Sequence, residues 1–325
     1  MLISKTIELT YDDFLAEISS PKYPICPSTT NLDPYLGCSH DCLYCFAPEH
    51  WRLPEASFTW TTGNPVVVKS NIPDLLQRHL EISRAQGEPI HPVYLSGWTD
   101  AYQPTEGSAG VTRKCLEILI QAKVAFFIVT KSSLVLRDVD LLSEARDDCA
   151  ICLSICTQDE QLARLLEPGA PTVDERVETI RDLVDKGIKT IVKVDPIIPS
   201  VNDNLNAIHD LLTQLKSAKL SHVTAQVMRM TMAAWKRMSA SMDVRRLELL
   251  QELYFNGEGK LTNEKGYALA SYRRSLTEQI KALVNDFGFT FSTCRVAEGP
   301  QLSDGPCNGI ELPSRCPSIV TGRKG

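Results

Sequence analysis

The sequence lacks the long apolar runs that membrane-spanning segments need. The apolar run at residues 124–129 has the length of a buried strand and is far too short for a bilayer span. The first residues show no signal-peptide pattern, because Glu8, Asp12 and Asp13 follow too soon for one. Internal repeats and low-complexity segments are also absent from the sequence. We therefore expect a protein of the cytoplasm with no membrane partner.

An excess of positive charge is lacking as well. The chain has 34 lysine and arginine residues against 40 aspartate and glutamate residues, which gives a formal net charge of −6. This balance argues against a broad nonspecific attraction to nucleic acid or acidic membranes, although it allows a local basic groove. At 325 residues the chain is long enough for one barrel-sized domain, alone or with an appendage.

Cysteine is the residue type that stands out. The chain has 11 cysteines, an odd number, and with no evident secretion signal this usage indicates metal and redox chemistry rather than a disulfide framework. Three of them stand at spacings of four and three residues: Cys38, Cys42 and Cys45. The same spacing would place three side chains on one face of a helix. Because Pro34 and Pro48 bracket the run and leave room for only a turn or two, we interpret it as a metal-binding loop.

The number of cysteines in this loop is informative. A closed structural zinc site takes four protein ligands, and ordinary iron–sulfur clusters are likewise held by four thiolates. A set of three thiolates would leave one iron of a [4Fe–4S] cluster free to bind another molecule.

This motif, with Tyr44 before its last cysteine and Phe46 after it, resembles that of the radical S-adenosylmethionine (SAM) enzymes. The resemblance implies that Cys38, Cys42 and Cys45 hold a [4Fe–4S] cluster whose open iron binds the amino and carboxylate groups of SAM. It also implies an electron donor such as flavodoxin or ferredoxin, and cleavage of SAM to methionine and a 5′-deoxyadenosyl radical. The motif itself says almost nothing about the substrate.

Beyond this loop, runs of strand and helix length alternate along the chain. Strands are expected at residues 93–97, 125–130, 151–156, 189–195 and 222–228, and helices at residues 73–86, 112–123, 139–147, 173–186 and 203–217. With the segment at residues 31–36, this makes six strand–helix units, and such alternation predicts a parallel sheet. The predicted fold is α/β, a partial (β/α)6 TIM-like barrel, which is also the fold that radical SAM enzymes share.

The chain is expected to divide into three parts. A lead-in of residues 1–30, with a helix near residues 11–18, precedes the radical SAM partial barrel of residues 31–230. Residues 231–325 follow as a C-terminal helical extension, with a strand at residues 287–293 and a cysteine-bearing tail.

Side-chain alternation in the predicted strands indicates a polar barrel interior. At residues 151–156, Cys152, Ser154 and Cys156 alternate with three apolar residues, and we expect the cysteine and serine set to face inward because helices cover the outside. The strand at residues 189–195 likewise places Lys193 on one side, together with Asp195. Buried polar groups are costly unless they find partners. A bound cofactor would supply such partners; alternatively, the polar side chains satisfy one another.

Within the superfamily the chain looks most like spore photoproduct lyase and its relatives, the DNA-repair-photolyase-like proteins. The matching segments are residues 33–40, 99–106, 130–132, 137–138, 167–168, 196–199 and 202–203, with Arg176. The resemblance implies that Thr99 and Asp100 accept hydrogen bonds from the SAM ammonium and that Lys131 pairs with the SAM carboxylate. A threonine–aspartate pair can instead cap a turn, and a lysine at the rim of a barrel can simply be solvated.

The same resemblance assigns roles to the inner face. Ser154 matches a family serine that contacts SAM, and Cys152, two residues earlier, matches a cysteine that returns a hydrogen atom to the product radical. The alternative for Cys152 is a small buried hydrophobe. We count Lys193 with the residues expected to bind the cofactor.

The tail departs from that family. Cys294, Cys307 and Cys316 stand among glycines and prolines and are expected to hold a second iron–sulfur cluster, with Cys26 or a non-cysteine ligand completing the set. Zinc, or three unligated thiols, are the alternatives. A second cluster would cast doubt on simple lesion reversal and would suit an electron relay, a substrate anchor or a sulfur source.

Taken together, these features predict a radical SAM enzyme that abstracts hydrogen from a small-molecule or natural-product substrate. The alternative within the family is a lyase that acts on a nucleic-acid lesion. A rival of another class is a non-catalytic protein with a structural zinc or iron–sulfur site. Such a protein would have no need for Thr99, Asp100 or polar inner faces.

Overall fold

A seven-stranded parallel sheet forms the centre of the molecule. The computed structural model describes residues 7–9, 30–49, 66–88, 90–256, 265–293 and 302–304. The strands lie in the order β12-β9-β8-β7-β6-β5-β2, and each hydrogen-bonded pair runs parallel. Their bounds are β2 (Thr30–Leu32), β5 (Val93–Leu95), β6 (Phe126–Thr130), β7 (Cys149–Ser154), β8 (Thr190–Ile197), β9 (His222–Val227) and β12 (Thr290–Ser292).

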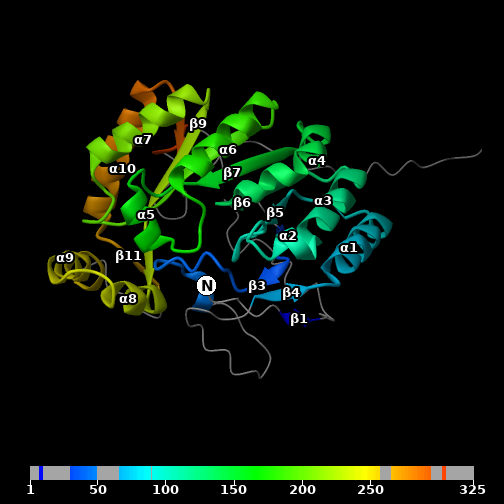
Figure 1. Ribbon diagram of the computed structural model, residues 1–325, viewed down its shortest axis with the longest axis horizontal. Helices are drawn as coiled ribbons and strands as arrows, with labels where there is room; N and C mark the ends of the chain where they lie inside the picture. Colours follow the sequence, from blue (N-terminus) through cyan, green and yellow to red (C-terminus); the bar gives the residue numbers. More distant parts are fainter. Residues whose placement is uncertain are drawn as a thin grey trace, which may run out of the picture.

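Helices cover one side of this sheet, and they follow one another in an arc in Figure 1. They are α1 (Ile72–Gln86), α3 (Val111–Gln121), α4 (Val139–Glu144), α6 (Val173–Asp185), α7 (Leu205–Ser217) and α10 (Ala270–Asp286). The strands follow chain order with no reversal, which is the arrangement of a barrel rather than of a doubly wound sheet. The predicted α/β partial TIM-like barrel is confirmed.

The helices begin where short polar side chains can cap them. Thr172 and Glu175 form a capping box at the start of α6. Helix α7 begins later than residue 203, because the side chain of Asn204 accepts from the first free backbone N–H groups. The helix expected near residues 11–18 lies outside the described residues. Within the described residues no helix combines the length and the apolar character that crossing a bilayer would require.

The two faces of the sheet carry different side chains, as the alternation predicts. Ile151 and Leu153 of β7 pack in the large core that includes the covering helices. Cys152 packs on the other face in a small separate cluster with Phe127 and Ile191. Cys156 does not continue this inner set: β7 ends at Ser154, so the alternation stops, and Cys156 packs in the large core.

Residues beyond the predicted barrel boundary at 230 also build the sheet. After α8 (Met232–Ser239), α9 (Val244–Phe255) and α10, the strand expected at residues 287–293 forms as β12, pairs in parallel with β9 and extends the expected six-stranded sheet to seven strands. Strand β10 (Arg229–Thr231) pairs antiparallel with β11 (Lys265–Tyr267). The division into three domains stays a prediction, but the central sheet draws on both the second and the third part.

A small second sheet supports the entry to the cysteine loop. Its strands are β1 (Ile7–Leu9), β4 (Val67–Lys69) and β3 (Tyr35–Leu36), with β4 in the middle. Strand β3 runs antiparallel to β4 and leads directly to Gly37, whose positive φ of 81° suits glycine. The pairing of β3 with β4 therefore fixes the position at which the cysteine loop begins.

Candidate active site

The three motif cysteines lie on an irregular loop after β3. The backbone N–H of Asp41 donates to the carbonyl of Cys38 at 3.4 Å, and the N–H of Cys45 donates to the carbonyl of Cys42 at 3.1 Å. These are separate turns, and Asp41 between them has a left-handed φ of 49°. The three cysteines therefore do not lie on one face of a helix. Their loop lies near the carboxyl ends of the parallel strands, where barrel enzymes carry their active sites.

The three thiols share one environment, in which Cys42 is buried and Cys38 and Cys45 are partly exposed. Burial raises the pKa of each, to about 12 for Cys42, and neighbouring thiols raise the pKa of Cys38 and of Cys42 further. Without a cation the three groups are therefore neutral thiols at physiological pH. Because the thiolate is the metal ligand, a metal centre bound here would displace protons from all three.

The donor set fits a cluster better than a single ion. Among the described residues no three His, Cys, Asp or Glu side chains meet closely enough to hold one metal ion. In a [4Fe–4S] cluster each cysteine binds a different iron, so its ligands share one environment without converging on one point. Three thiols on one loop, one buried and two partly exposed, with no fourth cysteine in the motif, are what such a cluster with one open iron requires.

The turn after α5 (Glu160–Leu166) presses against this loop. The N–H of Leu43 donates to the carbonyl of Leu166 at 2.8 Å, and the N–H of Gly169 donates to the carbonyl of His40 at 3.0 Å. A Cβ atom added at Gly169 would lie only 2.0 Å from the carbonyl oxygen of Ser39. This glycine is therefore required for the close approach of two backbones. Sequence reasoning missed it, although Gly169 directly follows the matched residues 167–168.

The loop after β5 holds the cysteine loop from another direction. The amide of Gln103, which is fully buried, accepts from the N–H of Ser39 at 3.0 Å and donates to the carbonyl of Gly37 at 3.1 Å. Asp33, just before β3, accepts from the backbone N–H groups of Trp98 at 3.0 Å and Thr99 at 3.3 Å. Thr99 is thereby fixed beside the start of the cysteine loop.

Asp100 lies at the junction of three loops. Its buried carboxylate accepts from the hydroxyl of Thr130 at 2.7 Å and from the N–H groups of Lys131 at 2.8 Å and Tyr102 at 2.9 Å. The Nδ1 atom of His40, in the cysteine loop, lies 3.3 Å away. Burial alone would raise the pKa of Asp100, but His40, Thr130 and Lys131 outweigh it and lower the pKa to about 2. Asp100 is therefore ionised, and its described contacts all hold together the loops at the rim of the barrel.

Lys131 belongs to a second buried cluster of charges. Glu167 accepts from Arg176 at 2.5 Å and from the hydroxyl of Tyr44, and the Nζ atom of Lys131 lies 3.7 Å from it. Burial would raise the pKa of Glu167, but Lys131 and Arg176 outweigh it and lower the pKa. The same Lys131 ammonium lowers the pKa of Cys42 against the larger effect of burial. The lysine thus stands between the cysteine loop and Glu167, with its side chain 16% exposed.

The inner face of the sheet carries the remaining predicted residues. Ser154 lies beside Lys193 in the register of β7 and β8, and the Nζ atom of Lys193 lies 2.8 Å from Asp195. Cys152 is 1% exposed, and burial raises the pKa of its thiol to about 12, so it keeps its proton. The phenol of Tyr94 interacts electrostatically with both Cys152 and Lys193. Polar side chains therefore lie in a row along the inner face. Two of them, Lys193 and Asp195, pair with each other.

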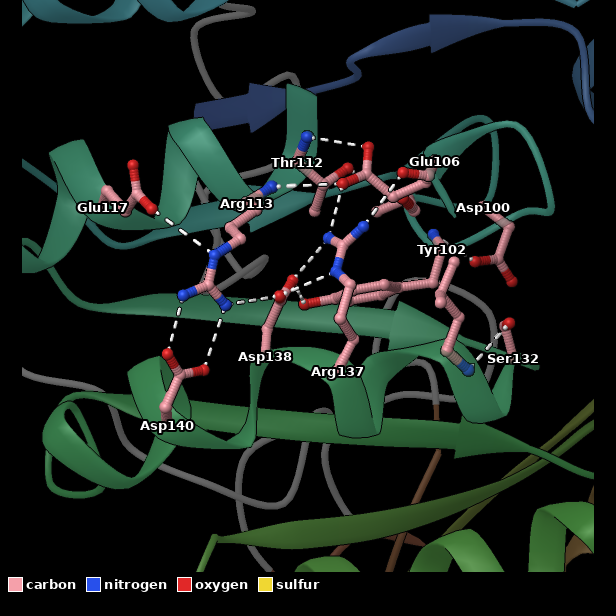
Figure 2. A network of polar contacts seen from close by, with 12 residues as sticks. Asp100, Tyr102, Glu106, Thr112, Arg113, Glu117, Ser132, Arg137, Asp138 and Asp140 are labelled. Atoms are coloured by element: carbon pink, nitrogen blue, oxygen red, sulfur yellow. Dashed lines mark hydrogen bonds and ion pairs between the residues drawn. The ribbon is translucent and has the colours of Figure 1, made fainter. Parts of the chain in front are cut away.

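A polar network that the sequence analysis did not assign supports the same rim (Figure 2). Glu106 is buried and accepts from the N–H of Thr112 at 2.9 Å, from Arg137 at 2.6 Å and from the hydroxyl of Tyr35 in β3. Asp138 accepts from Arg137 at 2.7 Å, from Arg113 at 2.8 Å and from Tyr102 at 3.1 Å. Most of these residues stand in the matched segments, so a signal existed, but nothing local in the sequence shows that they meet.

The predicted site residues thus fall into groups. Those brought together at the rim are Cys38, Cys42, Cys45, Thr99, Asp100 and Lys131, and those on the inner face are Cys152, Ser154 and Lys193. Electrostatic interactions of Cys38 with Asp100, of Cys42 with Lys131 and of Cys152 with Lys131 connect these groups. Cys294, Cys307 and Cys316, and also Cys26, lie outside the described residues.

Sequence comparison finds a matching family and several relatives. The sequence model of the radical SAM superfamily matches residues 32–212. An uncharacterized protein of Methanocaldococcus jannaschii is 32% identical over 173 residues, 53% of this chain and 61% of that protein. An uncharacterized protein of Mycobacterium tuberculosis is 30% identical over 225 residues, 66% of this chain and 64% of that protein. A radical SAM Nα-GlyT isomerase of Pseudomonas phage M6 is 22% identical over 268 residues, 81% of this chain and 52% of that protein. This chain thus spans less than two thirds of the length of these relatives.

Comparison with solved structures addresses the fold. Spore photoproduct lyase complexed with a dinucleoside spore photoproduct has a TM-score of 0.68 at 16% identity, covering 88% of this chain and 82% of the lyase. SuiB of Streptococcus suis bound to S-adenosylmethionine has a TM-score of 0.51 at 16% identity, covering 85% of this chain and 53% of SuiB. At such low identity these likenesses establish a shared architecture.

Proposed function

This chain belongs to the radical SAM superfamily, and from that premise we propose that it uses SAM and a [4Fe–4S] cluster to abstract hydrogen from a small-molecule or natural-product substrate. The observation that carries the proposal is the cysteine loop. Three thiols, one buried and two partly exposed, stand at the carboxyl edge of a partial barrel, held between the loop after β5 and the turn after α5. An inner face with a lysine, an aspartate and a protonated thiol begins beside them.

In this proposal Cys38, Cys42 and Cys45 hold the cluster, and its loading requires each thiol to give up its proton. The chemistry that the bound cluster and SAM supply is the one-electron cleavage of SAM to methionine and a 5′-deoxyadenosyl radical. The protein contributes a fixed loop and a cation, Lys131, beside Cys42. Fixing ligands through contacts beyond the ligands themselves is a general requirement of metal sites.

SAM recognition is assigned to the rim and the inner face. SAM carries an ammonium and a carboxylate, and we place Thr99 and Asp100 toward the first and Lys131 toward the second. The internal contacts of Asp100 mean that it acts in good part by orienting His40 and the Lys131 backbone. Ser154 and Lys193, side by side on adjacent strands, are assigned to the part of SAM that reaches the inner face.

Cys152 is assigned the return of a hydrogen atom to a substrate radical. The step forms a bond from hydrogen to the substrate carbon and breaks the S–H bond, leaving a thiyl radical on Cys152. Support comes from its inner-face position and from burial, which keeps the thiol protonated. The Cys152→Ala variant should still cleave SAM but give a changed product distribution. Cys149, buried on the opposite face of β7, provides the control Cys149→Ala, whose products should be unchanged.

A nucleic-acid lesion is the second candidate substrate. Phe46, next to Cys45, meets Trp98 edge to face with ring centroids 5.7 Å apart, and the Arg229 guanidinium lies 5.4 Å from the centre of the Phe46 ring. Such a surface suits stacking on a base, and spore photoproduct lyase has been solved with a dinucleoside lesion. The net charge of −6 favours the small molecule. If the reconstituted protein consumes added dinucleoside photoproduct, the substrate is a nucleic-acid lesion.

We also assign a second iron–sulfur cluster to Cys294, Cys307 and Cys316, and flavodoxin or ferredoxin as the electron donor. The names of the relatives include a lyase and an isomerase, so the reaction that follows hydrogen abstraction is left open. Measuring the iron content of variants tells the two proposed clusters apart. Serine variants of the tail cysteines should lose one cluster and keep the other.

The proposed catalytic cluster is tested by anaerobic reconstitution and electron paramagnetic resonance (EPR). The reduced wild-type protein should give a [4Fe–4S] signal that changes on addition of SAM, because SAM binds the open iron. Cys38→Ser, Cys42→Ser and Cys45→Ser should lose that signal. Cys115→Ser, at a buried cysteine of α3, should keep it. A SAM-responsive signal that survives in the three motif variants would overturn the assignment.

A further inference from the structure

Arg237 reaches the cysteine loop from outside the matched family region. It lies in the last turn of α8, whose first turn is capped by the hydroxyl of Thr231, which accepts from the N–H of Ala234 at 3.2 Å. From there its Nη2 atom donates to the backbone carbonyl of Cys45. In Figure 1 helix α8 lies close to the blue segment that carries the loop. Because the family model ends at residue 212, this contact belongs to the C-terminal part of this chain.

The remaining nitrogens of this guanidinium are buried without a partner. Nε and Nη1 of Arg237 have no solvent contact and make no hydrogen bond in the described structure. No carboxylate of the described residues lies within ion-pair distance of Arg237, although Asp41 interacts with its charge over a longer range. Buried charged donors that stay unpaired are costly, and native structures rarely keep them without a function.

Through Nη2 the guanidinium binds the backbone of Cys45, so its charge also acts on the thiol of that residue. Burial raises the pKa of this thiol, and the positive charge of Arg237 lowers it. Lys131, the other cation that lowers the pKa of Cys45, acts through charge alone.

We propose that Arg237 donates its free N–H groups to the sulfur atoms of the cluster held by Cys38, Cys42 and Cys45, and thereby raises the cluster's reduction potential. The inference rests on the proposed function. Reduction adds one negative charge to the cluster, and hydrogen bonds to its sulfurs together with a nearby cation stabilise the reduced form more than the oxidised form. In this proposal Arg237 contacts the cluster and its ligand loop, and its effect is on the reduction potential of the cluster.

The test is an EPR-monitored redox titration of the anaerobically reconstituted protein. In Arg237→Gln the ratio of reduced to oxidised cluster at a given ambient potential should fall about tenfold, which equals 59 mV for one electron. Arg237→Lys keeps the charge but loses the planar fork of donors, so its ratio should fall by about threefold. Lys236→Gln removes an exposed charge from the same helix and should leave the titration unchanged.

The outcomes separate this inference from the function on which it rests. A glutamine variant that binds the wild-type amount of iron at an unchanged midpoint would overturn the role of Arg237. If the glutamine variant takes up no iron, the lysine variant decides, and a wild-type midpoint there would contradict the inference. A wild-type protein that assembles no SAM-responsive cluster would instead contradict the proposed function.

Discussion

At the scale of single residues, the site depends on buried charges that are matched by several partners each. Asp100 is surrounded by four donors, and Glu167 by Arg176, Tyr44 and Lys131. Removing one member of such a set leaves the others buried and uncompensated. The cost of that change exceeds the net value of the interaction itself.

Glu167→Gln should destabilise the fold strongly, because Arg176 and Lys131 lose their shared counter-charge in a buried place. We expect the free energy of unfolding in urea to fall by about 3 kcal/mol or more. Glu178→Gln provides the control. Glu178 is 65% exposed and pairs with Arg181, so its loss should amount to less than about 1 kcal/mol. Equal losses in the two variants would refute the view that the Glu167 cluster supports the loop.

His222 should make the stability of the protein depend on pH. It is buried between β9 and β12, with Nδ1 2.7 Å from the hydroxyl of Thr290 and Nε2 2.8 Å from that of Ser292. Burial lowers the pKa of His222 to about 4, against a weaker opposing effect of Asp304. As pH falls from about 6.5 to about 4, the unfolded chain binds a proton at this residue and the folded chain does not. Stability is therefore complete above pH 6.5 and declines by about 3 kcal/mol toward pH 4.

The measurement compares urea unfolding at pH 7 and pH 5 for the wild type and His222→Gln. The variant should show a weaker loss between the two pH values, because its side chain does not titrate. His209→Gln, at an exposed histidine of α7, should keep the wild-type dependence. A wild-type dependence in the His222 variant would rule out this residue as the source.

At the scale of elements, the close approach of two loops sets the position of the cysteines. Gly169 and Leu166, at the end of α5, contact the backbone of His40 and Leu43. These contacts join segments more than a hundred residues apart in the sequence. The position of the cysteine loop thus depends on a turn that carries no ligand.

Gly169→Ala should displace the cysteine loop, because the new Cβ would meet the Ser39 carbonyl at 2.0 Å. Steric overlap of this kind costs about 1–3 kcal/mol, and we expect a lower iron content after reconstitution together with a lower midpoint of thermal unfolding. Gly107→Ala is the matched control, since its Cβ would find the nearest atom only at 3.9 Å. Full iron content in the Gly169 variant would show that the loop tolerates the shift.

The sequence predicts elements well where the signal is local. The Thr172 and Glu175 pair marks the start of α6, and the alternation around Cys152 gives the two faces of β7 correctly. Prediction from the sequence fails where an element is held in place by contacts with a distant part of the chain. No periodicity marks the short strand β4, which is held by β3, and nothing near Gly169 indicates that Ser39 will lie against it.

At the scale of the whole molecule, the barrel and its site are assembled from both ends of the chain. Strand β2 near the N-terminus and β12 near the C-terminus form the two edges of one sheet, and Arg237 of α8 reaches back to Cys45. The α/β barrel could be predicted because six of its strands recur with helices in order. The seventh strand and Arg237 could not be placed, since long-range pairing leaves no trace in local composition.

The central claim is that the cysteine loop supports radical chemistry on SAM, and its most direct measurement is an assay for 5′-deoxyadenosine. The anaerobically reconstituted protein is incubated with SAM and dithionite, and the nucleoside is quantified by chromatography. The wild type should form 5′-deoxyadenosine and methionine together, and Cys42→Ser should form neither. A wild-type protein with a fully assembled cluster that forms no 5′-deoxyadenosine, or a Cys42→Ser variant that forms as much as the wild type, would contradict the account.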